Sequence, residues 1–518
     1  MKVAILTSLL AALALVFTAC APKQDDATSD EKSLEADSFP LLPKEQRAES
    51  FDAVAGKLDL GGELFTFMDF GDMMKQMGES IGGFMQSMQM IQPYDQGLAM
   101  MGSLPYDSIF ETLGLNNFTA MGMSSYREGT LFHNKEVIYL PGGPEGIFTL
   151  TGVENKPFDT LALAPKDADL FLEQNLHASV IEQMIREGSA EIFKGKKGRE
   201  MANEILGEEL NDAGMTVGEL LQKSDTRLTI VMRLGLSHEL DLPGMADPFS
   251  IPSMHFVIRL EGMAWLVEDE IIETSRMKRD ETGDVVVYTP KTPPPPGGPL
   301  GGMDPAFIVD KAGGSLFFTT DLDFWQECTS GDSSLSDSPE YQAAVKDLPT
   351  GGTSLIYVSK DTFNAFVDLR DNAKASTEFG GVLGIYELIL PILGIGEQSE
   401  SSAYVTMIGE DFIFSEGRWP VYSDGSMSGN SAVIMTGMFA AMAIPSFNKV
   451  RETSREKVVT NNLRQIASAG QQYILETGEP EVKYPQLVGD YFSEIQPVAG
   501  ESYEDLVVKE AGGTLTVT

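Results

Sequence analysis

Residues 354–358 read Ser-Leu-Ile-Tyr-Val, a short run of the side chains that favour β-strands. A helical pattern through Phe363, Phe366 and Val367 follows this run. Two further strand patterns, residues 403–408 and 412–414, come after the helical pattern. Because apolar residues spaced three and four apart indicate a helix and alternation indicates a strand, this stretch predicts the order strand, helix, strand, strand.

The same order of patterns occurs twice earlier in the chain. Its strands are residues 64–68, 118–123 and 136–140 in the first case and residues 169–173, 227–232 and 255–260 in the second. The three cases predict a degenerate internal repeat with units at about 49–160, 161–348 and 349–422, although any α+β chain yields such patterns by chance. We expect an α+β fold in which repeated strand-helix-strand units form antiparallel sheets with helices on one face.

The composition restricts the class of protein and its partners. The chain has 518 residues, which predicts two or three domains, and 42% of them are hydrophobic. Its 77 acidic and 37 basic residues give a net charge of −40, which nucleic acids and anionic lipid headgroups repel. We therefore expect no nucleic-acid partner.

The N-terminus has the pattern of a secretory signal. Lys2 precedes an uncharged apolar run that ends at Ala19, a length that suits a signal and is short for a membrane span. The following Phe17-Thr18-Ala19-Cys20 resembles the lipobox of bacterial lipoproteins, with Phe17 where the family prefers Leu. This resemblance implies cleavage after residue 19, a diacylglycerol thioether on Cys20 and an acylated amine. An ordinary signal peptide or a short core helix is the alternative.

The lipobox resemblance also implies a location. Residues 1–19 are the expected signal peptide, and residues 20–48, rich in small and charged side chains, are the expected lipidated tether. Several acyl chains make such an anchor effectively permanent, which gives a periplasm-facing protein of the cell envelope. Ala21 after the cysteine resembles the signal for outer-membrane sorting.

The segment 431–518 predicts a long helix followed by a small hairpin. Five residues fall at spacings of four, three, four and three, which places them on one helix face: Val459, Leu463, Ile466, Gly470 and Tyr473. Pro445 would kink such a helix, and strands at 506–508 and 514–517 flank Gly512-Gly513. Residues 437–478 resemble the N-terminal helix of type IV pilins and type II secretion pseudopilins. The resemblance implies a helix packed on a small sheet, with pseudopilins or other envelope proteins as partners.

The pilin resemblance has departures, and a membrane role for its apolar part stays open. A pilin begins with a leader and an apolar run that carries one Glu, whereas this helix is internal and has no Glu there. The uncharged residues Ser431–Phe447, which include Gly437, would span about 25 Å as a helix, against a hydrocarbon core of about 30 Å. Insertion would place the anchor in the inner membrane, against the hint from Ala21. A buried helix of a pilin-like bundle is the competing reading.

We recognise no motif in the sequence that is typical of a catalytic, cofactor or metal site. His133, His177, His238 and His255 form no metal-ligand spacing, and Cys328 has the features of a buried structural cysteine. We expect no metal, no cofactor and no catalytic residue. The layout 316–320, a helix, then Leu348-Pro349 loosely resembles uncharacterised repeat-containing envelope proteins of bacteria. That resemblance implies no activity.

The sequence favours a non-enzymatic cell-envelope lipoprotein that docks to a secretion or pilus-type assembly through its pilin-like tail. A periplasmic binding module for a polymer or a hydrophobic ligand is the alternative. An enzyme with an acidic site that the sequence does not reveal stays a third hypothesis, which clustered buried carboxyl groups with raised pKa values would favour.

Overall fold

The structure is a computed structural model of the whole chain. It describes residues 42–71, 106–192, 196–208, 215–240, 249–268, 277–291, 304–375, 400–421, 462–489 and most of 502–509, with single positions between these ranges. The chain divides into two compact units, Met1–Ser431 and Ala432–Thr518. Each unit is treated by itself below.

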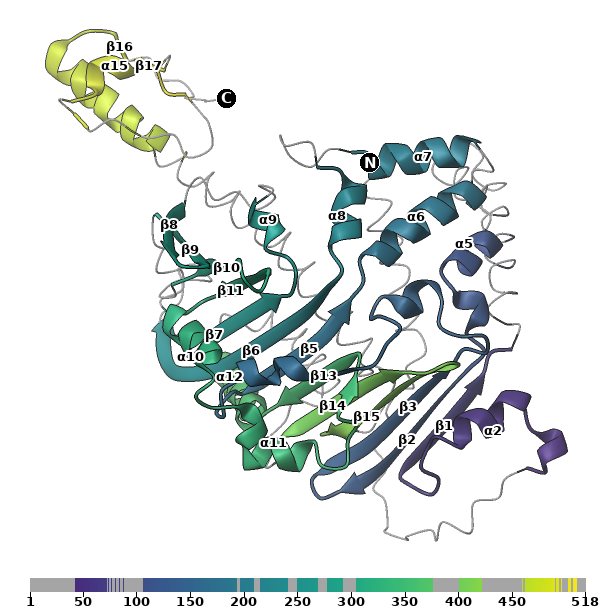
Figure 1. The fold of residues 1–518 in the computed structure, drawn as a ribbon. Coiled ribbons are helices and arrows are strands. Elements are labelled where there is room, and N and C mark those ends of the chain that lie inside the picture. Colours follow the sequence, from purple (N-terminus) through teal and green to yellow (C-terminus); the bar gives the residue numbers. More distant parts are fainter. Residues whose placement is uncertain are drawn as a thin grey trace. The chain divides into compact units, whose positions relative to one another are not determined.

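The first unit is built on a 13-stranded antiparallel sheet (Figure 1). The strand order is β1-β2-β3-β15-β14-β13-β5-β6-β7-β11-β10-β9-β8. The bounds are β1 Leu64–Asp69, β2 Ala120–Glu128, β3 Leu131–Tyr139, β5 Leu170–Leu176, β6 Thr226–Leu240, β7 Phe249–Leu260, β8 Met277–Thr282, β9 Val285–Pro290, β10 Ala306–Asp310, β11 Ser315–Thr319, β13 Ser354–Val358, β14 Ser402–Ile408 and β15 Phe412–Trp419. A separate pair joins β4 (Lys156–Pro157) and β12 (Gly351–Gly352). The expected α+β class with a large antiparallel sheet is confirmed.

Three groups of strands share one topology. In each group the first strand leads through helices to a second strand that pairs with it, and a third strand follows directly and pairs with the second. These groups are β1-β2-β3 (unit 1), β5-β6-β7 (unit 2) and β13-β14-β15 (unit 3). The sequence predicted all nine of these strands. It missed β8 and β10, and these two strands extend the sheet beyond unit 2 together with β9 and β11.

The register of the pairs fixes which residues correspond between units 1 and 3. Leu64 of β1 pairs with Ser125, and Ser354 of β13 pairs with Thr406. Gly62 lies two residues before Leu64, and Gly352 lies two residues before Ser354. A Cβ at Gly62 would clash with the carbonyl oxygen of Ser125, and a Cβ at Gly352 would clash with the carbonyl oxygen of Thr406. Because both glycines admit the same close backbone approach, Ser125 and Thr406 hold equivalent positions.

This correspondence continues into the junction between units 1 and 3. Ser125 pairs with Asn134 on β3, and Thr406 pairs with Ser415 on β15. The next residues, Lys135 and Glu416, are therefore equivalent, and they also pair with each other across β3 and β15. A local pseudo-twofold axis thus relates units 1 and 3 and passes between Lys135 and Glu416.

A second local axis relates units 2 and 3, which meet through their first strands. Leu172 of β5 faces Ile356 of β13 at the centre of this pair. The bonds on either side are reciprocal: the Asn175 N–H donates to the Thr353 carbonyl at 3.0 Å, and the Ser359 N–H donates to the Asp169 carbonyl at 2.7 Å. First strands of this repeat are therefore able to pair with one another edge to edge.

Helices cover both faces of the sheet, so the expectation of helices on one face is wrong. We call the face that carries Phe317 face A and the face that carries Leu316 face B. On face A, Phe317 stacks edge-on against Trp325 of α10, with ring centroids 6.2 Å apart. On face B, Leu316 belongs to a cluster with Val267 of α9. Because β11 reads Ser-Leu-Phe-Phe-Thr, neighbouring apolar side chains point to opposite faces and both faces need a cover.

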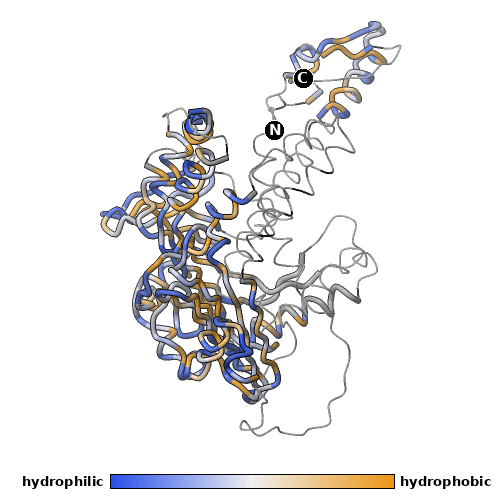
Figure 2. The backbone as a smooth tube through the Cα atoms, turned by 90° about the vertical axis from the view of Figure 1, so that its right-hand side faces the viewer, coloured by the Kyte–Doolittle hydropathy of each residue, from blue (hydrophilic) through white to orange (hydrophobic). Residues whose placement is uncertain are grey.

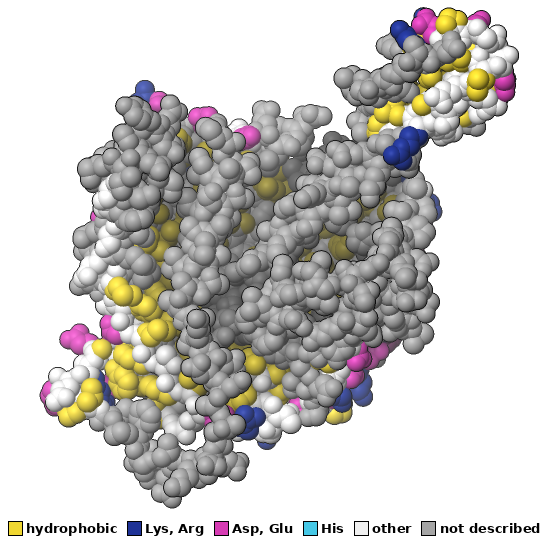
Figure 3. Space-filling view, turned by 180° about the vertical axis from the view of Figure 1, so that it is seen from behind, with side chains coloured by type: hydrophobic (Ala, Val, Ile, Leu, Met, Phe, Trp, Pro, Cys, Tyr) yellow, Lys and Arg dark blue, Asp and Glu magenta, His cyan; other side chains and the backbone are white. Residues whose placement is uncertain are grey.

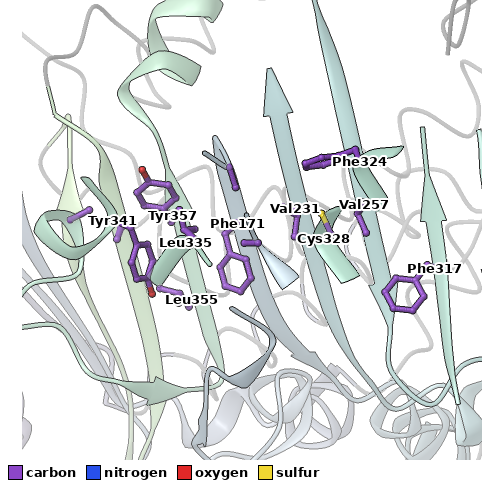
Figure 4. Close-up of a cluster of buried hydrophobic side chains, with 14 of the residues drawn as sticks. Phe171, Val231, Val257, Phe317, Phe324, Cys328, Leu335, Tyr341, Leu355 and Tyr357 are labelled. Carbon is purple, nitrogen blue, oxygen red and sulfur yellow. The ribbon is translucent and has the colours of Figure 1, made fainter. Parts of the chain in front are cut away.

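The main core lies on face A. It joins strands β5, β6, β7, β11 and β13 to α10 and α11, and Figure 4 shows its aromatic members. Phe171, Tyr357 and Phe324 are at most 1% exposed. The helices of this unit are α2 Glu49–Ala55, α5 Tyr106–Thr112, α6 Ser179–Ile192, α7 Lys196–Leu206, α8 Val217–Lys223, α9 Trp265–Glu268, α10 Leu322–Ser330, α11 Pro339–Ala344 and α12 Lys360–Ala375.

The second unit is a helix packed on a two-stranded sheet. Its helix covers residues 462–477, β16 (Glu481–Lys483) pairs with β17 (Val507–Lys509), and α15 spans Tyr484–Leu487. Figure 2 shows hydrophobic and hydrophilic residues side by side along this helix. The long pilin-like helix expected over 437–478 is not supported. In the described residues β17 pairs with β16, and residues 514–517, the second strand of the expected hairpin, lie outside the described residues.

Candidate functional site

Several expected site residues lie outside the described part of the chain. They are Cys20, the proposed lipidation position, and the residues of the candidate membrane segment, Ser431, Gly437, Pro445 and Phe447. Residues 292–299, which read Thr-Pro-Pro-Pro-Pro-Gly-Gly-Pro and predict an extended loop or linker, lie outside it as well. Among the helices that the structure does describe, none is long and apolar enough to cross a bilayer.

The expected helix-packing face lies in the second unit. Ile466 is fully buried in a core that also contains Tyr484, Leu487 and Val508, and Leu463 and Tyr473 pack against this core. Gly470 faces β17, and a Cβ there would come within 2.6 Å of Val508. The helix and the strand therefore approach each other more closely than any larger side chain at position 470 would permit.

The opposite side of this helix carries an exposed leucine. Leu475 is 85% exposed and follows Ile466 by nine residues, which at about 100° per residue places it on the far side of the helix. Hydrophobic side chains are visible on the surface of this unit in Figure 3. Beside it, the Tyr491 hydroxyl donates to Glu476 at 2.7 Å, and this bond lowers the pKa of Glu476. The exposed leucine is therefore next in sequence to a residue that a hydrogen bond ties to Tyr491.

A cluster of charged side chains lies on face A where units 1 and 3 meet. The His133 Nε2 lies 2.8 Å from the Glu416 carboxylate, and the imidazole stacks on Tyr126 with ring centroids 4.9 Å apart. Lys135 Nζ lies 3.0 Å from Asp59 and 3.6 Å from Glu416. His133 is 5% exposed and Glu416 has a side chain 14% exposed, whereas Asp59 and Glu128 at the rim of the cluster are more accessible to solvent.

Arg418 completes the cluster. Its Nε donates to Glu128 at 2.8 Å, and its Nη1 donates to the Lys346 carbonyl at 2.5 Å just beyond α11. The hydrogen bond from Arg418 lowers the pKa of Glu128. Burial alone would raise the pKa of Glu416, but the hydrogen bond from His133 and the charge of Lys135 outweigh it and lower that pKa. Both carboxylates are therefore held as anions that tie three strands and a helix end together.

Two other carboxyl groups have raised pKa values. Burial raises the pKa of Glu173 and of Asp169. Glu173 accepts bonds from the backbone N–H and the hydroxyl of Thr160, and Asp169 accepts a bond from the Leu234 N–H at 2.8 Å. Because backbone and hydroxyl donors already use these carboxyl oxygens, the arrangement fixes neighbouring segments and presents no arranged acid-base pair.

No pattern in the sequence indicated this cluster. His133 lies in β3 and is buried. Its partners Glu416 and Arg418 stand almost 300 positions away, so only the strand pairing brings them together. Within the described residues, no group of three or more His, Cys, Asp or Glu side chains has an arrangement that would hold a metal ion.

Comparison with known proteins identifies no relative of this chain. No protein-family model, no curated protein and no solved structure matches this chain significantly. The resemblances to lipoproteins and pilins therefore rest on the residues quoted for them.

Proposed function

We propose that this chain is a non-enzymatic lipoprotein of the cell envelope, anchored through Cys20, which docks to a secretion or pilus-type assembly through its C-terminal unit. The single observation that carries the proposal is that residues 432–518 form a compact unit with a core of their own. A unit that buries its own apolar side chains is able to keep its shape when the surface that surrounds Leu475 contacts a partner.

The other features of the chain agree with a structural role. The sheet of the first unit is long, its two faces are covered, and the charged side chains of the His133 cluster are bonded to one another. The net charge of −40 disfavours nucleic acid as the partner. Among the described residues, the two carboxyl groups with raised pKa values, Glu173 and Asp169, do not form the cluster that an acidic catalytic site would need.

The test is crosslinking in cells followed by mass spectrometry of the captured proteins. The full chain is compared with a chain that lacks residues 432–518. A second variant, Ile466→Asp, disrupts only the core of the C-terminal unit, because a charge without a partner in that core costs several kcal/mol, about 3–5. We expect components of one envelope assembly to be captured by the full chain and by neither variant. Equal capture by all three chains would reject docking through this unit.

A further inference from the structure

The two ends of the large sheet differ in how they are protected. At one end, β8 reads Met-Lys-Arg-Asp-Glu-Thr, and its side chains beyond Met277 are exposed. Charges on an edge strand prevent pairing with another chain. At the other end, β1 reads Leu-Phe-Thr-Phe-Met-Asp and carries no charge from Leu64 to Met68. The edge formed by β1 therefore lacks the protection that the edge formed by β8 has.

Strand β1 corresponds to two strands that pair with each other inside this chain. It is the first strand of unit 1, as β5 and β13 are the first strands of units 2 and 3. In the β5–β13 pair, Leu172 faces Ile356 at the local axis, and the residue of β1 that corresponds to both is Thr66. Most residues of β5 and β13 are buried, whereas Leu64 to Met68 are only half-buried.

We propose that β1 pairs antiparallel with β1 of a second copy of this chain, about a twofold axis at Thr66, so that two sheets join edge to edge. In this register Leu64 of one copy faces Met68 of the other. The occupant is a second copy because the β5–β13 pair joins two versions of the same unit through the same strand. A strand edge that pairs with an identical edge needs no different protein as its partner.

The hydrogen-bonding pattern of the β5–β13 pair defines the geometry at the axis. Asn175 bonds to Thr353, and Ser359 bonds to Asp169, through their backbones. Hydrogen-bonded pairs alternate with non-hydrogen-bonded pairs along two antiparallel strands, and Leu172 and Ile356 lie three positions from each bonded pair, so they form a non-hydrogen-bonded pair. Side chains at such pairs are closest, with Cα atoms about 4.5 Å apart. By correspondence, the two copies of Thr66 would meet on face B at this short separation.

Acidic residues at both ends of the proposed pair make it sensitive to salt. Glu63 of one copy would lie opposite Asp69 of the other. The corresponding residues of the β5–β13 pair are Asp169 and Ser359, and there the Ser359 hydroxyl donates a hydrogen bond to the Asp169 carboxylate at 2.7 Å. Arg127 lies 3.1 Å from Glu63 and neutralises part of this charge. Since salt screens the remaining repulsion, the dimer gains strength as ionic strength rises.

The first experiment is disulfide trapping with the full chain in detergent. Thr66→Cys places two thiols at the non-hydrogen-bonded pair, where Cβ atoms are close enough for a disulfide. The matched control is Thr282→Cys, on the protected edge strand β8. We expect mild oxidation to give a dimer of the first variant, with the disulfide located at position 66 by mass spectrometry, and none of the second. No dimer from the first variant, or equal amounts from both, would overturn the proposal.

The second experiment uses charge and needs no covalent bond. Thr66→Lys and Thr66→Glu each place like charges opposite each other at the axis, which weakens self-association by about fivefold. A mixture of the two variants places opposite charges there, so sedimentation should recover a dimer, and this recovery also proves that both variants are folded. Self-association unchanged in the single variants, or a parent chain that stays monomeric at high salt and high concentration, would contradict the pairing.

Discussion

Lys135 and Glu416 face each other across β3 and β15, with Nζ and Oε1 3.6 Å apart, and they hold equivalent register positions in two groups of strands that share one topology. Identical residues would meet at this position if the two groups were identical. Opposite charges instead make β3 complementary to β15 and not to another β3. The pair therefore favours the junction inside one chain over the same junction between chains.

The first prediction concerns this pair. Lys135→Glu places a carboxylate beside Glu416 and Asp59, and we expect it to lower the free energy of unfolding by about 2 kcal/mol or more. Adding Glu416→Lys restores an opposite pair, so the double variant should be more stable than the sum of the single changes predicts. Urea unfolding of the four proteins measures the coupling.

A matched exposed pair provides the control for this cycle. Lys509 and Glu481 lie 3.8 Å apart and are both more than half exposed. Because exposed pairs contribute little, Lys509→Glu should change the free energy of unfolding by no more than about 0.5 kcal/mol. A cost at this pair equal to the cost at Lys135 would mean that the buried junction has no special role.

The second prediction concerns pH. The hydrogen bond from Arg418 lowers the pKa of Glu128 in the folded protein, so this group stabilises the fold above its unfolded pKa, about 4.3, and loses the contribution as pH falls towards its lowered value. Glu128→Gln should therefore destabilise the protein at pH 7, and the difference from the parent chain should shrink below about pH 4. Urea unfolding across pH 3 to 7 measures it.

Glu173 serves as the opposite control, because burial raises its pKa. A raised folded pKa means that its contribution weakens as pH rises through the unfolded pKa towards the folded one. The difference between Glu173→Gln and the parent chain should therefore shift in favour of the variant as pH rises. The same pH trend for both variants would show that we have assigned the causes of these pKa shifts wrongly.

The third prediction tests the repeat through its glycines. Gly62→Ala and Gly352→Ala each force a Cβ against a carbonyl oxygen of the paired strand, and we expect similar losses of about 1–3 kcal/mol in the free energy of unfolding. Gly409→Ala is the control, since its Cβ would meet nothing closer than 3.6 Å. Thermal and urea unfolding compare the three. A loss at only one of the two equivalent positions would weaken the case for a repeat.

The fourth prediction uses the two cysteines. Burial raises the pKa of the Cys328 thiol to about 12, so Cys328 should not react with thiol reagents in the folded protein at pH 8. If Cys20 carries a thioether, the unfolded chain should titrate one thiol, that of Cys328. Two thiols in the unfolded protein purified from membranes would reject lipidation of Cys20.

The strands were predictable because their residues carry the pattern locally. Runs such as 354–358 and 403–408 combine β-branched and aromatic side chains over the length of a strand. Strand β8 was missed because four consecutive charges replace the expected alternation, which suits an edge strand. In the second unit, Gly470 and Ile466 stood out by helical spacing, whereas the partner of β17 did not, since residues 481–483 are a short, half-charged segment.

The arrangement of these elements was not predictable from local patterns. Pairing of β3 with β15 joins residues 132–139 to residues 412–419, and no spacing in the sequence signals this contact. In the sequence, His133, Lys135 and Arg418 resemble ordinary surface residues until that pairing is known. The cover on both faces likewise depends on which helix returns to which side of the sheet.

The most direct test of the proposed function is photo-crosslinking from a single position in cells. A photoreactive amino acid replaces Leu475, the exposed leucine of the C-terminal unit, and in a matched control it replaces Val153, which is 63% exposed on the first unit. The account predicts that position 475 captures one defined envelope protein that position 153 does not capture. The same proteins from both positions, or none from position 475, would contradict docking through the C-terminal unit.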